Sequence, residues 1–446
     1  MQSKNKLPKN YSSSNLIKHV ENLFPICRSI TGKGSRKTLS YFESYFNVLK
    51  RIKFKSGEKV FDWEIPPEWN IKDAYIEHLD SGKKFANFEK NNLHVVGYSK
   101  AIQAEMELDI LLENIYSLPD NPDWIPYVTS YYEKRWGFCL SHNEKKNLPK
   151  GLYKVKIDSE FKEKGSLELS HAIIKGKKNK ELFFSSYICH PSMANNELSG
   201  PVILGKLIDY VNNNYPHPKN SYRYVLLPET IGSIAYLSKF SKLLKKNVIC
   251  GINLSCVGDE RAYSHVESPY GNTLADEALN AALLNLDNVK KYSFLKRGSD
   301  ERQYCSPKIN LPLCTFCRSK FGEYPEYHTS ADLPNTVVTD KGLNDSFQIL
   351  KNIIDAFEFG IYPLPLINCE PQLSKRGLMS SLSKRNIQAE SRNTLNILAY
   401  CNGKNTIFDI CKITNLNLKI VLLDIKRLTK YKIIKCFQSK QNPITF

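Results

Sequence analysis

One stretch of this sequence places a histidine where an apolar run stops. Leu182 to Ile188 is a run of strand length, and Cys189-His190-Pro191 follows it directly. Proline fixes a turn at this point, and Ser199-Gly200-Pro201 then opens an amphipathic run of helical period. Ligands of open α/β sheets bind at the C-terminal ends of strands, just before the helices. His190 is therefore a candidate ligand or proton carrier, although a histidine here could also simply cap a turn.

Four later loops carry polar side chains that could converge with His190. They are Glu229-Thr230-Ile231-Gly232, Asn253-Leu254-Ser255, Gly298 to Gln303 and Gly322 to Asp332, and the last of them contains His328. Each has an ordinary structural explanation when it is taken alone, for example Glu229 as a helix cap. Together they place two histidines and several carboxylates at successive loops of one sheet. Zinc hydrolases use such a set, with a few His and carboxylate ligands and an unligated glutamate as general base.

The elements that must position these loops alternate between strand-like and helical patterns. From Ser166 to about Pro363 the expected strands include 167–174, 182–188, 222–227, 248–254 and 313–318, and the expected helices include 201–212, 231–244, 272–284 and 342–357. This alternation predicts an α/β sandwich with a largely parallel sheet. Two further helical runs, Tyr11–Phe24 and Gly32–Phe46, precede it.

The regions on either side of this alternation have different patterns. Between about residues 70 and 165 short strand-like pieces alternate with turn residues, which predicts a β-rich insertion. A linker rich in Pro, Ser and charge follows the core, from Pro365 to Leu382. Beyond it, three short helical runs and a strand within Thr394–Phe437 predict a winged helix. We therefore expect a core of residues 1–69 and 166–370, an insertion of residues 70–165 and a winged helix of residues 380–446.

The third helical run of the winged helix would be its recognition helix. It carries only Lys419, Lys426 and Arg427 among many leucines. Reading of bases usually needs Arg, Asn or Gln side chains at the base edges. A structural or protein-contacting role is therefore favoured, and DNA binding stays open.

Composition narrows the class of protein. With 446 residues, 41% hydrophobic and 11% aromatic, the chain is long enough for two or three packed domains. The 63 Lys and Arg against 45 Asp and Glu give a net charge of +18, but the lysines are scattered beside asparagines and form no arginine-rich patch. No secretion signal precedes Asn15, and no apolar run approaches the roughly 20 residues of a membrane span. Twelve cysteines without such a signal predict reduced thiols in a cytoplasmic protein, and Cys314-x-x-Cys317 has no second pair with which to bind zinc.

The motifs, in this order, resemble those of the zinc-dependent aminopeptidase and carboxypeptidase superfamily. Its pattern is a histidine, then Asp-x-x-Ser-Gly, Glu-Glu-x-Gly, Asn-x-Asp and a late Tyr-His. The corresponding segments here are His190, Asn196-Glu197-Leu198-Ser199-Gly200, Glu229-Thr230-Ile231-Gly232, Asn253-Leu254-Ser255 and Tyr327-His328. The resemblance implies a three-layer, phosphorylase/hydrolase-like zinc-peptidase core.

Nearly the whole chain is also similar to a narrower group of bacterial aminopeptidase-like proteins. That group has a β-rich insertion and a C-terminal winged helix, and its genes often accompany those of polysaccharide or surface-sugar biosynthesis. The matching phrases are FDWEIPPEWNIKDAYI, YICHPSMANNELSGP, PETIGSIAYL, CVGDERAY, GSDERQYCSP and GEYPEYHTSADLPN.

Three positions depart from the superfamily pattern. Asn196 stands at the aspartate that bridges two metals, and Thr230 and Ser255 stand at two further carboxylate ligands. With these charges lost, a di-zinc centre of the usual kind is not expected. The hypothesis is one zinc per chain, held by His190 and His328 with one oxygen ligand; Asn196 is included among the metal-binding residues, and the identity of the third ligand is left open. Substitute carboxylates would be Glu197, Asp259, Asp300, Glu301 and Glu326.

The resemblance also assigns roles in a reaction. Glu229 would be the general base, and Asp300, Glu301, Arg302, Glu326 and Tyr327 would line the substrate pocket. The predicted function is a metal-dependent amide hydrolase of aminopeptidase type, acting on a small peptide-like or amide-bearing sugar substrate. Two alternatives remain: a catalytically inactive scaffold, and a regulator that senses a metabolite and binds DNA. The expected partner is a small molecule or short peptide, with no membrane, and a homo-oligomer is left open.

Overall fold

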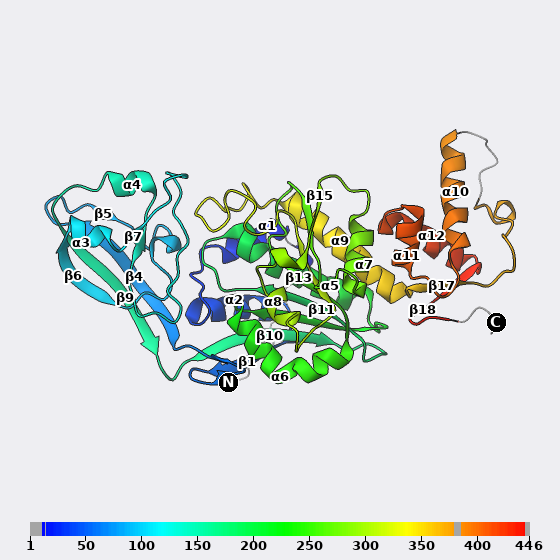
Figure 1. Cartoon of the computed structure of the whole chain (residues 1–446), viewed down its shortest axis with the longest axis horizontal. Coiled ribbons are helices and arrows are strands. Elements are labelled where there is room, and N and C mark those ends of the chain that lie inside the picture. The colour runs from blue at the N-terminus through cyan, green and yellow to red at the C-terminus, as the bar shows by residue number, and fades with distance from the viewer. Residues whose placement is uncertain (1–10, 14, 379–384, 442–446) are drawn as a thin grey trace.

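The molecule is elongated, with the insertion at one end, the α/β core in the middle and the winged helix at the other end (Figure 1). The computed structural model describes residues 11–13, 15–378 and 385–441. The N-terminal residues 1–10, in which a secretion signal was sought, lie outside this range, as do residues 379–384 and 442–446 at the ends of the predicted winged helix. Among the described helices, none combines the length and apolar character that a membrane crossing requires.

One mixed sheet of eight strands forms the centre of the core. Its spatial order is β1 (Leu49–Lys55), β10 (Ser166–Ile174), β12 (Ser221–Leu227), β11 (Glu181–Tyr187), β13 (Val248–Leu254), β16 (Leu313–Cys317), β14 (Tyr263–Val266) and β15 (Val289–Tyr292). Strands β12, β11, β13 and β16 run parallel to one another, whereas β10 is antiparallel to β12 and β14 is antiparallel to β16. The parallel part is therefore the middle of the sheet, and its strand ends meet at one edge.

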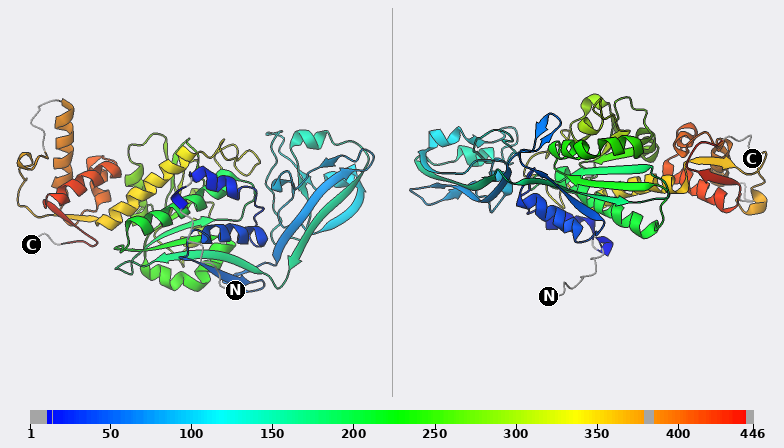
Figure 2. Two further views of the ribbon diagram at one scale, coloured as in Figure 1. Left: turned by 180° about the vertical axis from the view of Figure 1, so that it is seen from behind. Right: turned by 90° about the horizontal axis from the view of Figure 1, so that it is seen from below.

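Helices cover both faces of this sheet (Figure 2). Alternate residues of β11 divide between two hydrophobic clusters, with Leu182 and Phe184 in one and Phe183 in the other. The first cluster contains side chains of α1 (Leu16–Leu23), α2 (Lys33–Glu43), α5 (Ser199–Asn214), α7 (Leu274–Leu283) and α9 (Asp340–Phe359), and the second those of α6 (Ile231–Asn247) and α8 (Glu301–Tyr304). The period of two along the strand thus produces the predicted three-layer α/β core, which is confirmed.

The insertion has a small antiparallel sheet of its own. Its order is β5 (Lys84–Phe85), β4 (Glu68–His78), β9 (Leu152–Lys162) and β6 (Ile102–Glu107), with the short elements α3 (Leu108–Leu112), β7 (Ile115–Tyr116), β8 (Phe138–Cys139) and α4 (His142–Lys146) beside it. A separate hydrophobic cluster, from Ala74 to Ile157, fills its interior. A two-stranded hairpin, β2 (Lys59–Val60) and β3 (Trp63–Glu64), precedes β4. The exact domain limits stay a prediction.

The winged helix is continuous with the core. Helices α10 (Arg385–Ala399), α11 (Ile407–Thr414) and α12 (Leu418–Lys430) lead to β18 (Ile434–Phe437). Strand β18 pairs with β17 (Tyr362–Pro365), so the end of the core supplies the second strand of the wing, and the expected linker begins at the last residue of β17, Pro365. Buried residues of α11 and α12 belong to the same hydrophobic cluster as those of α7 and α9.

Candidate active site

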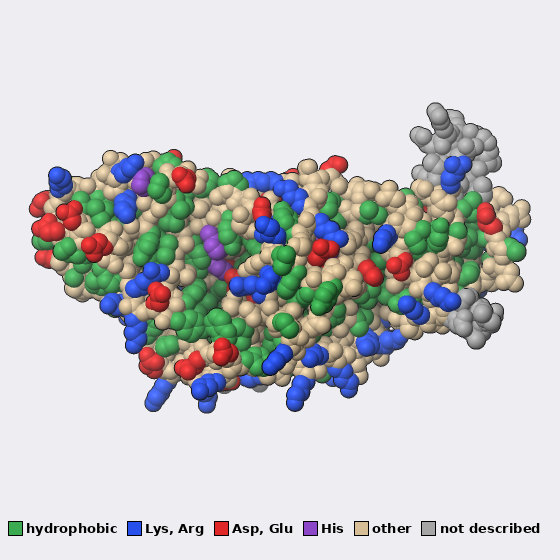
Figure 3. Space-filling view, viewed as in Figure 1, with side chains coloured by type: hydrophobic (Ala, Val, Ile, Leu, Met, Phe, Trp, Pro, Cys, Tyr) green, Lys and Arg blue, Asp and Glu red, His purple; other side chains and the backbone are tan. Residues whose placement is uncertain are grey.

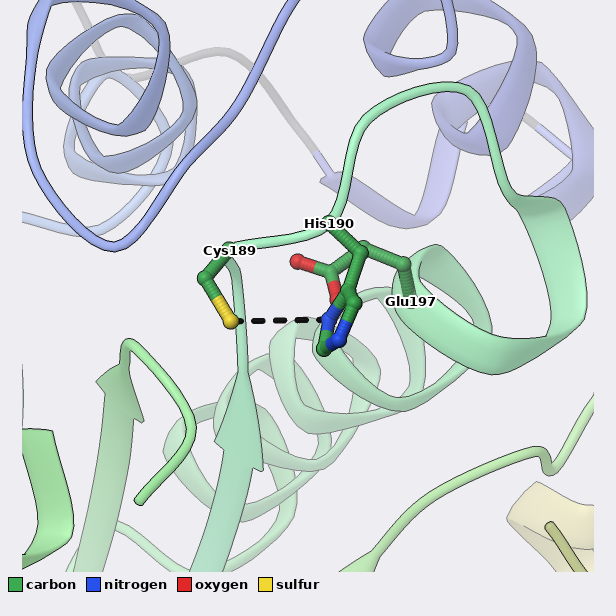
Figure 4. Close-up of side chains that lie close together, drawn as sticks. All are labelled: Cys189, His190 and Glu197. Carbon is green, nitrogen blue, oxygen red and sulfur yellow. Dashed lines mark hydrogen bonds and ion pairs between the residues drawn. The ribbon is translucent and has the colours of Figure 1, made fainter. Parts of the chain in front are cut away.

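His190 lies just beyond the C-terminal end of β11. All residues of β11 are buried, and the chain after Pro191 forms a buried π-helical turn, Ala194–Leu198, that leads into α5. Single π turns often occur at functional sites, because they re-aim side chains at the start of a helix. Here the turn brings Glu197 back to the imidazole of His190 (Figure 4).

The hydrogen bonds around His190 fix which ring nitrogen is available. Its Nδ1 lies 2.7 Å from Glu197 Oε2, and its backbone oxygen accepts a hydrogen bond from Arg28 Nε at 2.9 Å. The Arg28 guanidinium is also 3.8 Å from Glu197 Oε1, and both of these side chains are fully buried. With Nδ1 paired to a carboxylate, Nε2 is the nitrogen that can bind a metal or a substrate.

Cys189 does not complete a nucleophilic triad with these residues. Its Sγ lies 3.4 Å from Nδ1 of His190, the same nitrogen that Glu197 contacts, whereas a triad uses both ring nitrogens (Figure 4). Burial raises the pKa of the Cys189 thiol to about 11, which keeps it protonated at neutral pH. Burial alone would lower the pKa of His190, but the Glu197 carboxylate paired with its Nδ1 opposes this effect, and the pKa is raised above the usual value.

Glu229 follows β12, the strand next to β11. Its Oε2 lies 3.7 Å from Nε2 of His190, so the two side chains face each other across the ends of neighbouring strands. Its backbone N–H donates to Cys189 Sγ at 3.2 Å. Burial raises the pKa of the Glu229 carboxyl, although the charge of His190 partly opposes this effect. A partly buried carboxylate with a raised pKa and a histidine in reach is typical of a general base.

The residue after Glu229 has a strained backbone. Thr230 has φ 62° and ψ −77°, which is costly for a β-branched residue. Two neighbours hold it in place: Asp300 Oδ1 accepts the Thr230 N–H at 2.8 Å, and Arg302 donates to Thr230 Oγ1 at 2.8 Å. Burial, followed by the charge of Glu229, raises the pKa of Asp300 to about 8. Asp300 and Arg302 therefore support the turn that presents Glu229, and Arg302 remains exposed to solvent.

His328 is held between two tyrosines. Its ring stacks on Tyr327 at a centroid distance of 3.8 Å and meets the edge of Tyr127 at 5.1 Å, while the ring of His190 lies at 5.4 Å. Its Nε2 is buried and has no hydrogen-bond partner within the described part of the chain. Burial, then the nearby charge of His190, lowers the pKa of His328 to about 3, so the ring is neutral and can offer a lone pair.

The insertion fixes the backbone of His328. Tyr127 N–H donates to the His328 carbonyl at 2.9 Å, and Ile125 exchanges two hydrogen bonds of 2.9 Å with Ser330. His328 has a φ of 57°, a left-handed conformation that such contacts can stabilise. Local sequence patterns do not predict the contact of residues 125–127 with this loop, because the two segments lie about 200 positions apart.

Asn196 belongs to a chain of neutral hydrogen-bonding groups. Its Nδ2 donates to Tyr187 Oη at 3.0 Å, and Tyr187 Oη lies 2.7 Å from Ser255 Oγ. Asn196 Oδ1 is buried with no partner among the described residues. The tyrosine hydroxyl thus links two positions at which the resemblance implies carboxylates, Asn196 and Ser255, and this arrangement needs no charge.

The other carboxylates predicted as substitute ligands are engaged elsewhere. Asp259 accepts from the Ser319 N–H and hydroxyl, Glu301 accepts from two backbone amides at Gly298 and Ser299, and Glu326 forms a bidentate pair with Arg261 at 2.7 and 2.8 Å. Glu197 is the partner of His190, as described above. The structure therefore brings Glu229 and His328 beside His190, whereas Asn196 is connected to His190 through the ring of Tyr187. The carboxylates of Asp259, Glu301 and Glu326 are directed to other partners.

A cavity of about 230 Å³ opens beside His190 and Glu229. The remaining lining residues are Ile30, Trp63, Tyr131, Tyr132, Cys189, Thr230 and Ile231. Trp63 comes from the β2–β3 hairpin, and the two tyrosines come from the insertion. On the face seen in Figure 3, histidine and acidic side chains gather near the boundary between the insertion and the core, with hydrophobic side chains beside them. Local sequence patterns did not predict that Trp63, Tyr131 and Tyr132 would line this site.

Comparison with known proteins agrees with this fold. Residues 17–359 match a family model described as "Domain of unknown function (DUF4910)". The chain belongs to this family. Residues 363–436 match a model described as winged helix-turn-helix, which confirms the predicted C-terminal domain. A curated relative from Clostridium acetobutylicum is 39% identical over 88% of this chain and 89% of its own length. Its name is "Putative polysaccharide biosynthesis protein with aminopeptidase-like domain".

Solved structures place the DUF4910 chain among aminopeptidase folds. A crystal structure of a "putative peptidase" from Clostridium acetobutylicum has 36% sequence identity and a TM-score of 0.85, covering 96% of this chain and 97% of the other. A zinc aminopeptidase from Bacillus subtilis, at 13% identity, has a TM-score of 0.54 over 78% of this chain and 95% of its own. A peptidase M28 precursor from Shewanella amazonensis, also at 13% identity, has a TM-score of 0.51 over 77% and 92%. At 13% identity, the similarity of the last two structures shows the fold alone.

Two kinds of metal donor lie near His190 in this DUF4910 chain, and the close group of ligand atoms there consists of Cys189, His190 and Glu197. Nε2 of His190 is free of the bond to Glu197, and both Nε2 of His328 and Oδ1 of Asn196 are buried without a partner in the described residues. An unpaired buried polar atom costs about 1–3 kcal/mol unless something satisfies it. Imidazole nitrogen and amide or carboxylate oxygen are donors that zinc accepts. The hydrogen-bonded series Asn196, Tyr187 and Ser255 contains no carboxylate that could bind a second metal ion.

Proposed function

We propose that this DUF4910 chain is a metal-dependent amide hydrolase that acts on a small peptide-like or amide-bearing sugar substrate. The observation that carries the proposal is the pairing of Glu229 Oε2 with His190 Nε2 at 3.7 Å on the wall of a cavity. The unpartnered Nε2 of His328 and Oδ1 of Asn196 support it. If His328 and Asn196 only stabilised the fold, their buried polar atoms would be expected to have hydrogen-bond partners.

In this mechanism Glu229 is the residue that moves a proton. Its carboxylate accepts a proton from the attacking water and passes it to the nitrogen that leaves when the amide bond breaks. His190, His328 and Asn196 would hold a zinc ion, which supplies Lewis-acid polarisation of the carbonyl and acidifies water. Glu197 and Arg28 keep the imidazole of His190 in one orientation. Arg302, exposed beside Thr230, is available for an anionic group of the substrate.

The substrate class follows from two considerations. The cavity of about 230 Å³ is below the range of about 300–1,000 Å³ that is typical of small-molecule sites, so it accommodates one residue-sized group. The Clostridium acetobutylicum relative carries polysaccharide biosynthesis in its name. An amide on a sugar is therefore proposed alongside a short peptide.

Metal content tests the ligand assignment. Protein purified without added metal should contain about one zinc per chain, and His190→Ala and His328→Ala should each lose it. His217→Ala is the matched control, because His217 is exposed in the loop before β12, whereas Glu229 follows the other end of that strand. Zinc-free wild-type protein that also fails to bind added zinc would contradict the proposal and favour a scaffold.

Substitution of the base tests the chemistry. Glu229→Gln keeps the shape of the side chain but removes the carboxylate, and it should reduce turnover of a cleaved amide by about 10²–10⁴-fold. Zinc content should stay at the wild-type value, because Glu229 is not one of the proposed ligands. Full turnover by this variant would show that another group is the base.

A further inference from the structure

Two large aromatic side chains remain exposed at the mouth of the cavity beside His190. Trp63 is 40% exposed and Tyr132 is 55% exposed, although both lie against a cavity that could have buried them. Their ring centroids are 6.0 Å apart and their planes meet at 71°. The rings of Trp63 and Tyr132 therefore form an aromatic corner, and each ring is accessible to a ligand in the cavity.

The corner is held together by contacts between distant parts of the chain. Tyr132 Oη donates a hydrogen bond to the carbonyl of Glu64 at 3.1 Å, so the insertion is tied to the β2–β3 hairpin that carries Trp63. Tyr132 has a φ of 65°, and Phe61 in the turn of the hairpin has a φ of 57°. Left-handed backbone at non-glycine residues is costly and concentrates at ligand clamps. The exposed rings are thus kept in position at a cost in stability.

The lining of the cavity combines two kinds of side chain. Trp63, Tyr131 and Tyr132 form an aromatic wall, whereas His190, Glu229 and Thr230 provide polar groups. Only Ile30 and Ile231 contribute aliphatic surface, which is little for a leucine-like side chain. A pyranose ring combines one C–H face, which packs on an aromatic ring, with hydroxyl groups at its edge that need polar partners.

From this arrangement we infer that Trp63 and Tyr132 form a subsite for the pyranose ring of an N-acylated amino sugar. The inference rests on the proposed hydrolase function and names its substrate. The ring lies against the aromatic corner, and the amide reaches His190 and Glu229. Water adds to the amide carbonyl carbon, the C–N bond breaks, and the proton taken up by Glu229 goes to the nitrogen. The products are a carboxylic acid and a free amino sugar, with no oxidant or reductant required.

Binding of defined sugars tests the subsite independently of turnover. The probes are N-acetylglucosamine and N-acetylgalactosamine, with N-acetylleucine amide as the peptide-like comparison, all measured by saturation-transfer NMR on Glu229→Gln protein so that nothing is consumed. Saturation should be greatest at the ring C–H protons of the sugar. Trp63→Ala and Tyr132→Ala should each weaken sugar binding by about three- to tenfold, as expected when one aromatic contact is lost.

Control variants separate loss of stacking from loss of folding. Trp63→Phe keeps an aromatic face and should bind nearly as well as wild type. Tyr270→Ala removes an aromatic side chain that is 84% exposed and absent from the lining of this cavity, so sugar affinity should not change. Thermal unfolding of each variant shows whether the fold is retained.

The outcomes distinguish this inference from the proposed function. If neither sugar binds saturably, if the Trp63→Ala variant binds them as well as wild type, or if only N-acetylleucine amide depends on Trp63, the subsite is wrong. A wild-type protein that then hydrolyses peptide amides still satisfies the proposed function. Conversely, Trp63-dependent sugar binding without hydrolysis of any acylated sugar or peptide amide supports the subsite and contradicts the hydrolase.

Discussion

The insertion and the winged helix are attached to the core in opposite ways. The insertion has its own hydrophobic cluster, from Ala74 to Ile157, yet Tyr127, Tyr131 and Tyr132 reach the candidate active site. The winged helix shares the main hydrophobic cluster of the core, where the rings of Phe408 and Phe357 lie 5.6 Å apart. Its residues do not line the cavity at His190. The insertion therefore contributes side chains to the candidate active site, whereas the winged helix contributes to the hydrophobic packing of the core.

A second cavity, larger than the one at His190, illustrates the same division. A cavity of about 590 Å³ lies between α7 and α11 and is lined by residues such as Glu277, Phe408 and Lys412. None of the candidate catalytic residues contributes to it. Volume alone would select the cavity between the core and the winged helix as the active site, whereas the paired His190 and Glu229 select the smaller cavity. The smaller cavity is the candidate active site, because a site is identified by its reactive groups rather than by its volume.

The largest expected effect concerns stability, and it sets equal substitutions in the two regions against each other. Phe408→Ala should destabilise the core by about 3–5 kcal/mol, because a buried ring of the shared cluster is lost. Phe138→Ala, at a fully buried position of the insertion, should loosen mainly the insertion. Hydrogen exchange should therefore accelerate in α5, α7 and α9 for the first variant and in β4, β6 and β9 for the second. Identical exchange patterns would show that the two clusters unfold as one.

The junction between core and insertion should respond to acid. Burial favours protonation of Glu68, but its hydrogen bonds with Arg36 outweigh this and lower the pKa of Glu68 to about 2, from the usual value of 4.5. The stabilisation is complete above about pH 4.5 and is lost as pH falls towards 2. Glu68→Gln should cost about 2 kcal/mol at pH 7, since Arg36 is partly exposed, and the difference from wild type should vanish near pH 2. Urea unfolding across this pH range measures it, and a pH-independent difference would contradict the assignment.

The contact of Tyr127 with both histidines should affect the metal site. Tyr127→Ala removes the ring that lies 5.1 Å from His190 and from His328, and zinc affinity should fall about tenfold, as for other residues that orient ligands. Tyr127→Phe keeps the ring and should retain most of the affinity. Tyr400→Ala, a partly exposed tyrosine at the winged helix, is the control and should change nothing. Equal zinc affinity in the three variants would show that Tyr127 of the insertion does not contribute to the metal site.

The smallest expected effect concerns DNA. Two of the three basic residues predicted on the recognition helix are paired within the chain: Lys426 with Asp355 at 3.3 Å and Arg427 with Asp424 at 3.3 Å. Lys426→Ala and Arg427→Ala should therefore change the affinity of the full chain for duplex DNA by less than about threefold. Fluorescence anisotropy over a range of salt concentrations measures this. Sequence-selective binding that either variant abolishes would establish the winged helix as a DNA reader.

Much of the fold follows from local sequence patterns. Alternating runs gave the parallel strands β11, β12, β13 and β16 and the helices between them within a few residues. The edge strands β1 and β15, and β14 next to β15, were not predicted, because short or partly polar strands carry a weak period. Helix α10 begins at Arg385, earlier than the predicted start at Thr394, because few apolar residues mark its first turns.

The sequence by itself determined which residues stand at the ends of the strands. His190, Glu229 and His328 follow from the order of apolar runs and loops, since the C-terminal ends of parallel strands meet at one edge. It also determined that Asn196, Thr230 and Ser255 are uncharged. Only the tertiary structure decided what these side chains contact. Glu197 and Arg28, the latter 162 residues away along the chain, select the free nitrogen of His190, and Tyr127 and Trp63 enclose the site from other regions. Such contacts depend on how distant segments pack, and local periodicity carries no information about them.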